Sequence, residues 1–398
     1  MNVSRRAWLA LTAGGLAGCQ LPRFRDEAVE RARAEALLQM ERGFFTGAAF
    51  ARSDRGGEGY VGWQGWGPSS GAVDARTRFD AASLTKTVVA AVLARMAVDG
   101  RIDPDAPFTR YVPDHVAGRD TPITVRHLAT HTSGFGHAIA PARPAAPTTR
   151  LPCRPFEERL LAQAPRMAPG TCMYSCYNFQ LLALLAERVG GKPIDVLARE
   201  LVLLPLGMRH STWWPVPDDG HVAHPEVMPE DNFVIRKVGC VSDPPAYHAE
   251  RPTGNAGLFT TLGDLRRFTA DLLHRGRFPS AYYDLLFTCT HDKDGFRRSF
   301  GFNMSDRARV PGLSREAIHH TGYTGHSLVV DPVNDFAGVV LTTRSAGSGT
   351  FDGRLRILAA LRGQAQDFCK APRILLDYTH SRVARFYRFE RMSRDEET

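Results

Sequence analysis

A serine and a lysine three residues apart are the first pair in this chain that could do chemistry. Ser83 and Lys86 stand at the start of an apolar segment, 84–98, which predicts a helix ended by Asp99-Gly100. Residues at this spacing share a helical face, so the hydroxyl and the amine can meet. Serine becomes a nucleophile when a base takes its proton. Burial and the positive end of a helix both disfavour an ammonium ion, which predicts a lowered pKa for Lys86.

The same helix start would offer backbone N–H groups to an oxyanion that develops during attack on a carbonyl. A serine and a lysine at this spacing also arise by chance. In that case Ser83 would cap the helix and Lys86 would be solvated. The pair alone leaves both interpretations open.

Two further polar segments follow this pair along the chain. Tyr174-Ser175-Cys176 precedes an apolar helical stretch at 181–189, and His320-Thr321-Gly322 leads into a strand-like segment that contains Tyr323. In this order the three segments resemble the active-site motifs of the serine β-lactamase and penicillin-binding-protein superfamily, in its class C-like branch of D-alanyl-D-alanine carboxypeptidases and esterases. The resemblance extends from about residue 45 to 361 and includes the segments 79–82, 128–134 and 254–259.

The resemblance implies a mechanism through an acyl-enzyme. Ser83 would attack a carbonyl, and Lys86 would share the general-base work. Tyr174 would relay protons to the leaving group and later activate water; the alternative is a core tyrosine. The backbone N–H groups of Ser83 and Tyr323 would form the oxyanion hole. His320 holds the position of the basic or polar residue on the strand beside the cleft.

The resemblance also implies substrate contacts at Cys176, Thr321 and Gly322, and Arg344 is a candidate partner for a substrate carboxylate or a surface arginine. Cys176 stands where many relatives carry asparagine, and a thiol is a weak hydrogen-bond partner. It is either a packed small residue or a second nucleophile. His320 replaces the commoner lysine, and a neutral histidine binds a carboxylate less strongly. Both departures favour esters or D-amino-acid peptides over ordinary penicillins.

Strand patterns lie near both ends of the chain, with helical patterns between them. This arrangement predicts an α/β (α+β) protein in which the two ends complete one antiparallel sheet flanked by helices, with an all-helical insertion at about 103–255. The resemblance implies the same fold. The predicted strands are 45–51, 60–66, 327–330 and 336–342, and the predicted helices are 26–42, 84–98, 181–189, 260–274 and 355–361.

The N-terminus carries the pattern of an export signal. Arg5-Arg6 precede a short apolar run that ends in Leu16-Ala17-Gly18-Cys19, and the run is too short to span a bilayer. The arginines resemble a twin-arginine signal, and the last four residues resemble a lipobox, which would make Cys19 an acylated membrane anchor. An ordinary cleaved signal is the alternative. The sequence predicts a periplasmic lipoprotein divided into residues 1–18, 19–43, 44–362 and 363–398.

Other compositional features are less informative. The 398-residue chain has a net charge of +8 but no basic run with interleaved aromatics, so no nucleic-acid partner is expected. His127 and His131 lack the glutamate of a zinc motif, no C-x-x-C occurs, and neither metal nor cofactor is expected. Residues 67–71 match G-x-S-x-G, yet a poor helix follows, which favours a turn. The expected partner is a small-molecule or peptidoglycan-derived substrate.

Overall fold

The computed structural model describes residues 26–54, 56–65, 67–137, 153–224, 238–305, 310–344 and 352–363. The predicted export signal with Cys19, the loop at 138–152 and the C-terminal extension lie outside these ranges. The lipid anchor and the predicted domain boundaries therefore stay predictions. No helix within the described ranges is both long enough and apolar enough to cross a membrane.

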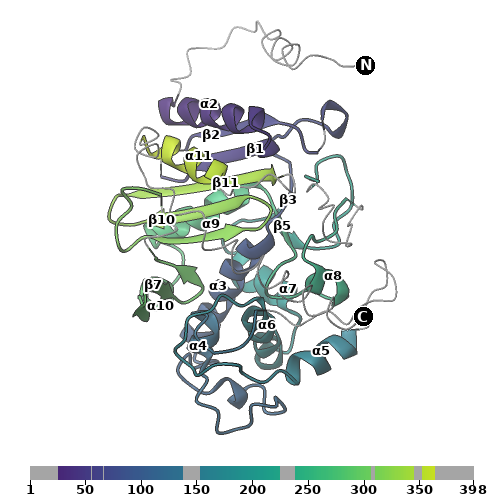
Figure 1. The fold of residues 1–398 in the computed structure, drawn as a ribbon, viewed down its shortest axis with the longest axis vertical. Helices are drawn as coiled ribbons and strands as arrows, with labels where there is room; N and C mark the ends of the chain where they lie inside the picture. Colours follow the sequence, from purple (N-terminus) through teal and green to yellow (C-terminus); the bar gives the residue numbers. More distant parts are fainter. Residues whose placement is uncertain are drawn as a thin grey trace, which may run out of the picture.

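The two ends of the described chain meet in one antiparallel sheet (Figure 1). β1 (Phe45–Arg52) pairs with β2 (Glu58–Gly62) on one side and with β11 (Phe336–Arg344) on the other. The strand order β2-β1-β11-β10-β9-β8-β7-β6 confirms the predicted sheet. The other strands are β6 (His291–Lys293), β7 (Phe296–Ser299), β8 (Phe302–Asn303), β9 (Ile318–Gly322) and β10 (His326–Asp331).

Helices cover both faces of this sheet. α2 (Glu27–Glu41) and α11 (Asp352–Arg362) pack together over one face, as Figure 1 shows, around a core that includes Phe50 and Val340. α3 (Thr85–Val98) and α9 (Leu262–His274) belong to the core on the opposite face. α3 is buried on nearly all sides, which explains why its sequence is apolar without a polar stripe.

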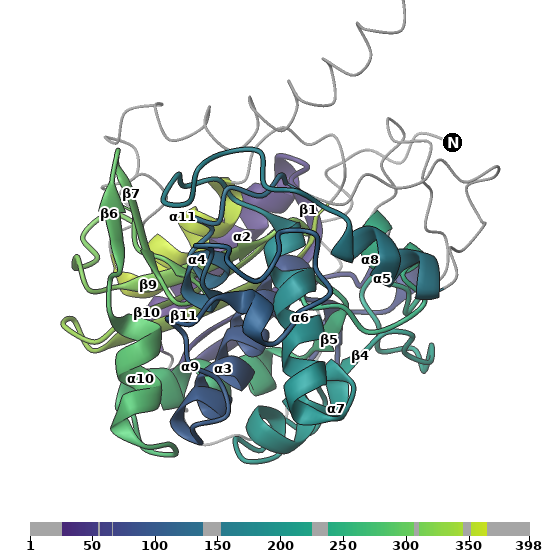
Figure 2. The same ribbon diagram turned by 90° about the horizontal axis from the view of Figure 1, so that it is seen from below.

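A largely helical region lies between β3 (Phe79–Asp80) and β5 (Leu258–Thr260), and Figure 2 shows α6 and α7 of this region beside α3. A small second sheet in the order β3-β5-β4 joins its entry and exit. Its elements are η3 (Phe108–Arg110), α4 (Val125–Ala129), α5 (Cys153–Leu161), α6 (Cys176–Gly190), α7 (Ile194–Ala198), the π-helix η4 (Arg199–Leu203), β4 (Thr212–Trp213) and α8 (Pro244–His248), and α10 (Ser280–Phe287) follows α9.

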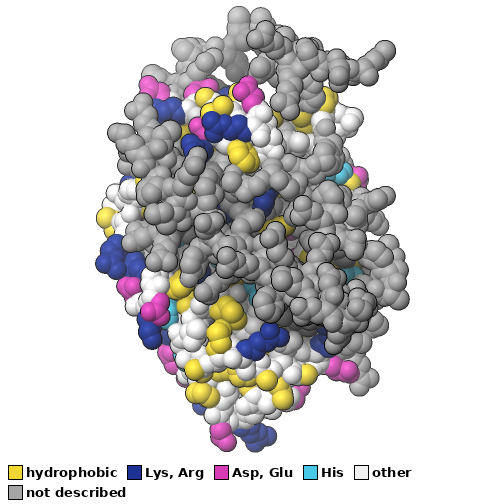
Figure 3. Space-filling model, in the orientation of Figure 1, with side chains coloured by type: hydrophobic (Ala, Val, Ile, Leu, Met, Phe, Trp, Pro, Cys, Tyr) yellow, Lys and Arg dark blue, Asp and Glu magenta, His cyan; other side chains and the backbone are white. Residues whose placement is uncertain are grey.

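Two predicted boundaries move in the structure. β2 ends at Gly62 rather than at residue 66, because Gly62 adopts a φ of +73°, which turns the chain out of the strand. α6 begins at Cys176 rather than at residue 181, because the Ser175 hydroxyl accepts a hydrogen bond from the Asn178 N–H and caps the helix. Basic side chains are scattered on the described part of the face in Figure 3, with no single basic patch there.

Two buried histidines hold the fold together in their neutral form. His115 Nδ1 accepts a backbone N–H 3.0 Å away, so its Nε2–H donates to the Tyr177 hydroxyl at 2.7 Å. His326 Nδ1 accepts the Thr342 N–H at 3.1 Å, and its Nε2–H donates to the Asp80 carbonyl at 2.7 Å. Burial lowers the pKa of His115 to about 4 and the pKa of His326 to about 3.

We expect acid to destabilise this fold through these histidines. In the unfolded chain they take up protons below about pH 6.5, whereas in the fold they stay neutral to much lower pH. The free energy of unfolding should fall below that pH by up to about 1.4 kcal/mol per pH unit for each histidine. Urea unfolding at several pH values measures the slope, which His326→Gln should reduce. An equal slope in the variant and the parent would contradict the account.

Candidate active site

The turn that carries Ser83 joins the sheet to the helical region. The chain leaves β3 at Asp80, makes one 3₁₀ turn, η2 (Ala82–Leu84), and continues into α3. The Asp80 carboxylate accepts the Ala82 N–H at 3.0 Å and the N–H and hydroxyl of Ser242 at 2.7 and 2.6 Å. Ala82 has a φ of +46°, which costs a non-glycine residue about 1–3 kcal/mol. The Asp80 contacts thus hold a strained turn.

The same turn is fixed to the β9–β10 hairpin. The Asp80 carbonyl accepts hydrogen bonds from Thr324 Oγ1 at 3.0 Å and from His326 Nε2 at 2.7 Å. Gly322, the last residue of β9, lies so close to the turn that an added Cβ would stand 2.9 Å from the Ala81 carbonyl oxygen. Glycine at this position lets the end of the strand approach the turn closely.

Two hydrogen-bond donors converge on Ser83 Oγ. Lys86 Nζ lies 2.9 Å away, and the Tyr174 hydroxyl lies 2.8 Å away. Ser83 is partly exposed and Lys86 is completely buried. Leu84, and not Ser83, precedes the first residue of α3, and no side chain caps that helix. The interpretation as a capping serine with a solvated lysine is therefore wrong.

Lys86 makes a second hydrogen bond, to the Asn255 carbonyl at 2.8 Å. Burial lowers the pKa of Lys86, but Cys176 and Tyr174 raise it when they carry negative charge, and the net pKa lies above its ordinary value. The predicted lowering of this pKa is thus wrong. The sequence indicated the burial of the amine but not the thiol and the phenol beside it, which stabilise the ammonium only when one of them has lost its proton.

The proton balance of this group decides which residue can act as the base. Burial raises the pKa of Tyr174, and the charge of Lys86 partly offsets that effect. A neutral phenol and an ammonium both donate to Ser83 Oγ, so neither can take its proton. Once the pair has lost one proton, either the phenolate or the amine becomes an acceptor. The geometry therefore allows Ser83 to pass its proton to the Lys86–Tyr174 pair.

Three imidazoles surround the Tyr174 ring, with centroid separations of 4.6 Å for His131, 5.9 Å for His137 and 6.3 Å for His320. Burial lowers the pKa of all three, and for His131 and His320 the pKa falls well below its ordinary value. His131 Nδ1 also accepts the Ser175 N–H at 3.1 Å, which fixes the backbone beside the tyrosine. The rings are neutral at pH 7 and position Tyr174 without adding charge.

The end of β9 brings the third predicted segment to the site. His320 is buried, and its Nδ1–H donates to the Thr321 carbonyl at 2.9 Å. Tyr323 is half exposed, and its carbonyl accepts a hydrogen bond from Arg344 Nη1 at 3.0 Å. The Arg344 guanidinium also lies 5.4 Å from the Tyr323 ring centroid. Arg344 thus holds Tyr323 through its carbonyl and its ring. The predicted substrate contacts of Thr321, Gly322 and Arg344 stay predictions.

Cys176 is the first residue of α6 and is buried beside the reacting groups. Burial raises the pKa of its thiol, and the charge of Lys86 only partly offsets this effect. A protonated thiol is a poor nucleophile. The position therefore fits a packed small residue better than a second nucleophile.

The competing motifs have local structural roles. Ser69, the serine of the G-x-S-x-G pattern, is exposed in a 3₁₀ turn, η1 (Pro68–Ser70), and not at a strand-to-helix junction. The neighbouring Ser70 hydroxyl fixes that turn by donating to the Gly67 carbonyl and accepting the Gly65 N–H. His127 Nδ1 accepts the Thr124 N–H in a helix cap. Across the ranges that the structure describes, no cluster of three or more His, Cys, Asp or Glu side chains could hold a metal ion.

Sequence reasoning missed the groups that hold the site in place. The Asp80 carboxylate and carbonyl fix the Ser83 turn, and the Asn255 carbonyl binds Lys86. Asp80 and Asn255 lie in segments that contribute to the family resemblance. Their hydrogen-bond partners could not be predicted from the sequence, because these partners are far away in the chain: Lys86 and Asn255 are 169 residues apart.

Comparisons with known proteins identify the family of this chain. The family model for beta-lactamase matches residues 28–361, and the chain belongs to that family. The chain is 28% identical to esterase EstB of Burkholderia gladioli over 316 residues, 69% of this chain and 79% of EstB. It is 27% identical over 238 residues to the D-alanyl-D-alanine-carboxypeptidase/endopeptidase AmpH of Escherichia coli K12, 58% of each chain.

A solved structure has the same fold. EstCE1, a hydrolase with promiscuous acyltransferase activity, superposes with a TM-score of 0.69 at 21% sequence identity, covering 85% of this chain and 98% of that one. The predicted family and the predicted fold class are both confirmed.

The hydroxyl of Tyr174 should be needed for chemistry and not for folding. Tyr174→Phe keeps the ring contacts but removes the donor to Ser83 Oγ, and we expect acylation by 4-nitrophenyl acetate to slow by about 100-fold or more. The pre-steady-state burst of nitrophenolate measures that rate.

Tyr177→Phe is a matched control for this experiment. It removes another buried hydroxyl, which donates to the Leu160 carbonyl at 2.6 Å and accepts from His115 Nε2 at 2.7 Å, away from Ser83. The control should lose about 1–3 kcal/mol of unfolding free energy, because two buried partners lose a hydrogen bond, and it should keep its burst rate. A Tyr174→Phe burst as fast as that of the parent would exclude a catalytic phenol.

Proposed function

We propose that this protein is a serine hydrolase that forms an acyl-enzyme on Ser83 and acts on esters or D-amino-acid peptides in preference to ordinary penicillins. The observation that carries the proposal is the pair of hydrogen bonds to Ser83 Oγ, 2.9 Å from Lys86 and 2.8 Å from Tyr174. A partly exposed hydroxyl between a buried amine and a phenol is suited to nucleophilic attack.

The reaction would follow from this geometry. Ser83 Oγ attacks the substrate carbonyl while its proton passes to the Lys86–Tyr174 pair. The oxyanion accepts hydrogen bonds from the backbone N–H groups of Ser83 and Tyr323, and the close approach of Gly322 to η2 supports that placement. Tyr174 then protonates the leaving group. Water attacks the acyl-enzyme with the help of the same pair and regenerates Ser83.

Two side chains support the preference for an ester over a penicillin. His320 is neutral, because burial lowers its pKa well below the ordinary value, so it gives no ion pair to the carboxylate of a penicillin. The protonated Cys176 thiol is a weak partner for a substrate amide. An ester needs neither contact. The relatives EstB and AmpH carry the names of an esterase and a carboxypeptidase, the two classes proposed here.

A second candidate function is a sensor that becomes acylated but releases the acyl group slowly. The thiol at position 176 favours it, because Cys176 and Lys86 interact and a thiol orients its neighbours less firmly than an amide would. The two functions differ in deacylation. A stable acyl-enzyme without steady-state hydrolysis of any ester supports the sensor.

The proposal is tested by intact mass and turnover together. The full chain is mixed with 4-nitrophenyl acetate, with nitrocefin and with a D-Ala-D-Ala peptide, and its mass and product release are followed. We expect an acyl mass on the parent chain and faster turnover of the ester or peptide than of nitrocefin. Ser83→Ala should lose both the mass shift and the turnover. Turnover that survives in Ser83→Ala, with no acyl mass on the parent, would overturn the proposal.

Location in the cell envelope, with an anchor at Cys19, is proposed on the residue pattern Leu16-Ala17-Gly18-Cys19 alone. The parent protein should fractionate with membranes, and Cys19→Ala should become soluble in the periplasm. A Cys19→Ala protein that remains in the membrane fraction would contradict the anchor.

A further inference from the structure

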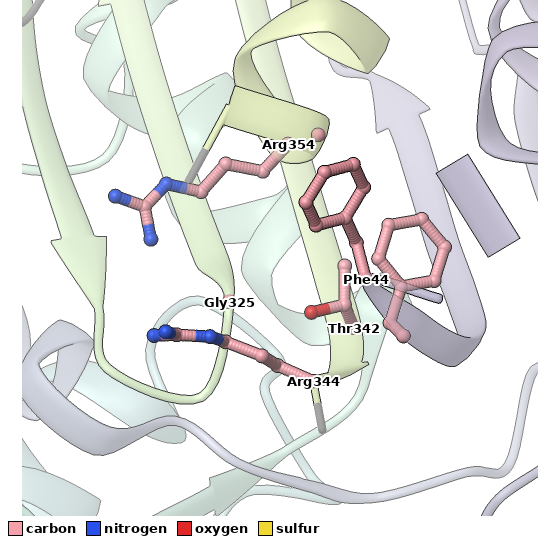
Figure 4. Close-up of a pocket in the computed structure, with 7 residues that line it drawn as sticks. Phe44, Gly325, Thr342, Arg344 and Arg354 are labelled. Atoms are coloured by element: carbon pink, nitrogen blue, oxygen red, sulfur yellow. The ribbon is translucent and has the colours of Figure 1, made fainter. Parts of the chain in front are cut away.

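Two arginines hold the two peptide groups that follow β9. Arg354 of α11 is 8% exposed and donates from Nη1 to the Gly322 carbonyl at 3.1 Å. Arg344, at the end of β11, donates to the Tyr323 carbonyl at 3.0 Å. Figure 4 shows both side chains extending in the same direction, on either side of Gly325. Their guanidinium groups therefore both reach the hairpin turn between β9 and β10.

Arg354 and Arg344 bind different peptide groups, and only the peptide bound by Arg354 contains the Tyr323 N–H. The carbonyl of Gly322 and the N–H of Tyr323 belong to one planar peptide group. A charged donor on the carbonyl is a strong hydrogen bond, and it polarises the peptide so that its N–H becomes a better donor. Arg344 acts on the next peptide, whose N–H belongs to Thr324.

The Gly322–Tyr323 peptide has little freedom to move. A Cβ on Gly322 would stand 2.9 Å from the Ala81 carbonyl oxygen, so η2 limits movement toward Ser83. The Thr324 carbonyl just beyond it accepts the Thr342 hydroxyl at 3.1 Å. The Gly322 carbonyl accepts both the Gly325 N–H and Arg354 Nη1, each at 3.1 Å, so Arg354 adds a charged donor to a peptide whose carbonyl is already held by the turn.

We infer that Arg354 is a positioning residue of the oxyanion hole, holding and polarising the Gly322–Tyr323 peptide so that the Tyr323 N–H meets the developing negative charge. This inference rests on the proposed function, because it needs an oxyanion formed by attack of Ser83. In this inference Arg354 acts on the oxyanion through its hydrogen bond to the Gly322 carbonyl, and not through direct contact with Ser83 Oγ.

The test compares an ester with its thionoester. A thionoester places sulfur where the oxyanion forms, and sulfur accepts hydrogen bonds poorly, so its reaction depends less on the oxyanion hole. Arg354→Met should lower kcat/KM for 4-nitrophenyl acetate by ~10-fold, less than the loss of a direct oxyanion donor. Its kcat/KM for O-(4-nitrophenyl) thionoacetate should change little, so the ratio of the two falls. Arg354→Lys should restore part of the ratio.

Arg362→Met is the matched control, because Arg362 lies on the same helix and donates to the Pro311 carbonyl at 2.8 Å, away from the Ser83 turn. Its ratio should equal that of the parent. Equal losses on both substrates in Arg354→Met and Arg354→Lys would assign Arg354 a structural role only and overturn the inference. A parent chain that gains no acyl mass on Ser83 would instead overturn the proposed function, and this inference with it.

Discussion

The geometry of the site depends on the hydrogen bonds of Asp80. Its carboxylate holds the strained backbone at Ala82, and its carbonyl accepts hydrogen bonds from Thr324 and His326 of the β9–β10 hairpin. One buried residue therefore fixes the position of the Ser83 turn relative to the sheet. Because β9 also ends against this turn, the nucleophile and the proposed oxyanion donor are set by the same contacts. The helical region adds Tyr174, the Ser242 donors to Asp80 and the Asn255 carbonyl that binds Lys86.

The chemistry of the site depends on proton sharing and not on a single activated base. Burial lowers the pKa of Lys86, the charges of ionised Cys176 and Tyr174 raise it, and burial raises the pKa of Tyr174, so the protonation of the amine and that of the phenol depend on each other. The neighbouring imidazoles of His131 and His320 are neutral, which leaves Lys86 as the main charge beside Ser83. In such a site Lys86 and Tyr174, which both contact the Ser83 hydroxyl, share one exchangeable proton.

The sequence predicted the parts of the site that local chemistry determines. Ser83 and Lys86 were visible from helical spacing, and Tyr174 and His320 from the order of motifs in the family. The contacts that join distant segments were not, because hydrophobic pattern and spacing carry no information on pairs such as Asp80 and His326, 246 residues apart. For the same reason the pKa of Lys86 was predicted in the wrong direction, since Cys176 and Tyr174 come from a distant segment of the chain, at and just before the start of α6. The sheet was predictable because strand patterns at both ends needed partners.

The central claim is that Lys86 and Tyr174 act on Ser83 as one proton-sharing unit, and a double-mutant cycle tests it most directly. Acylation rates are measured for Lys86→Met, Tyr174→Phe and the double variant. Residues that act as a unit give strongly non-additive losses. The account predicts that the double variant is about as slow as the slower single variant. Losses that multiply, as for two independent groups, would contradict it.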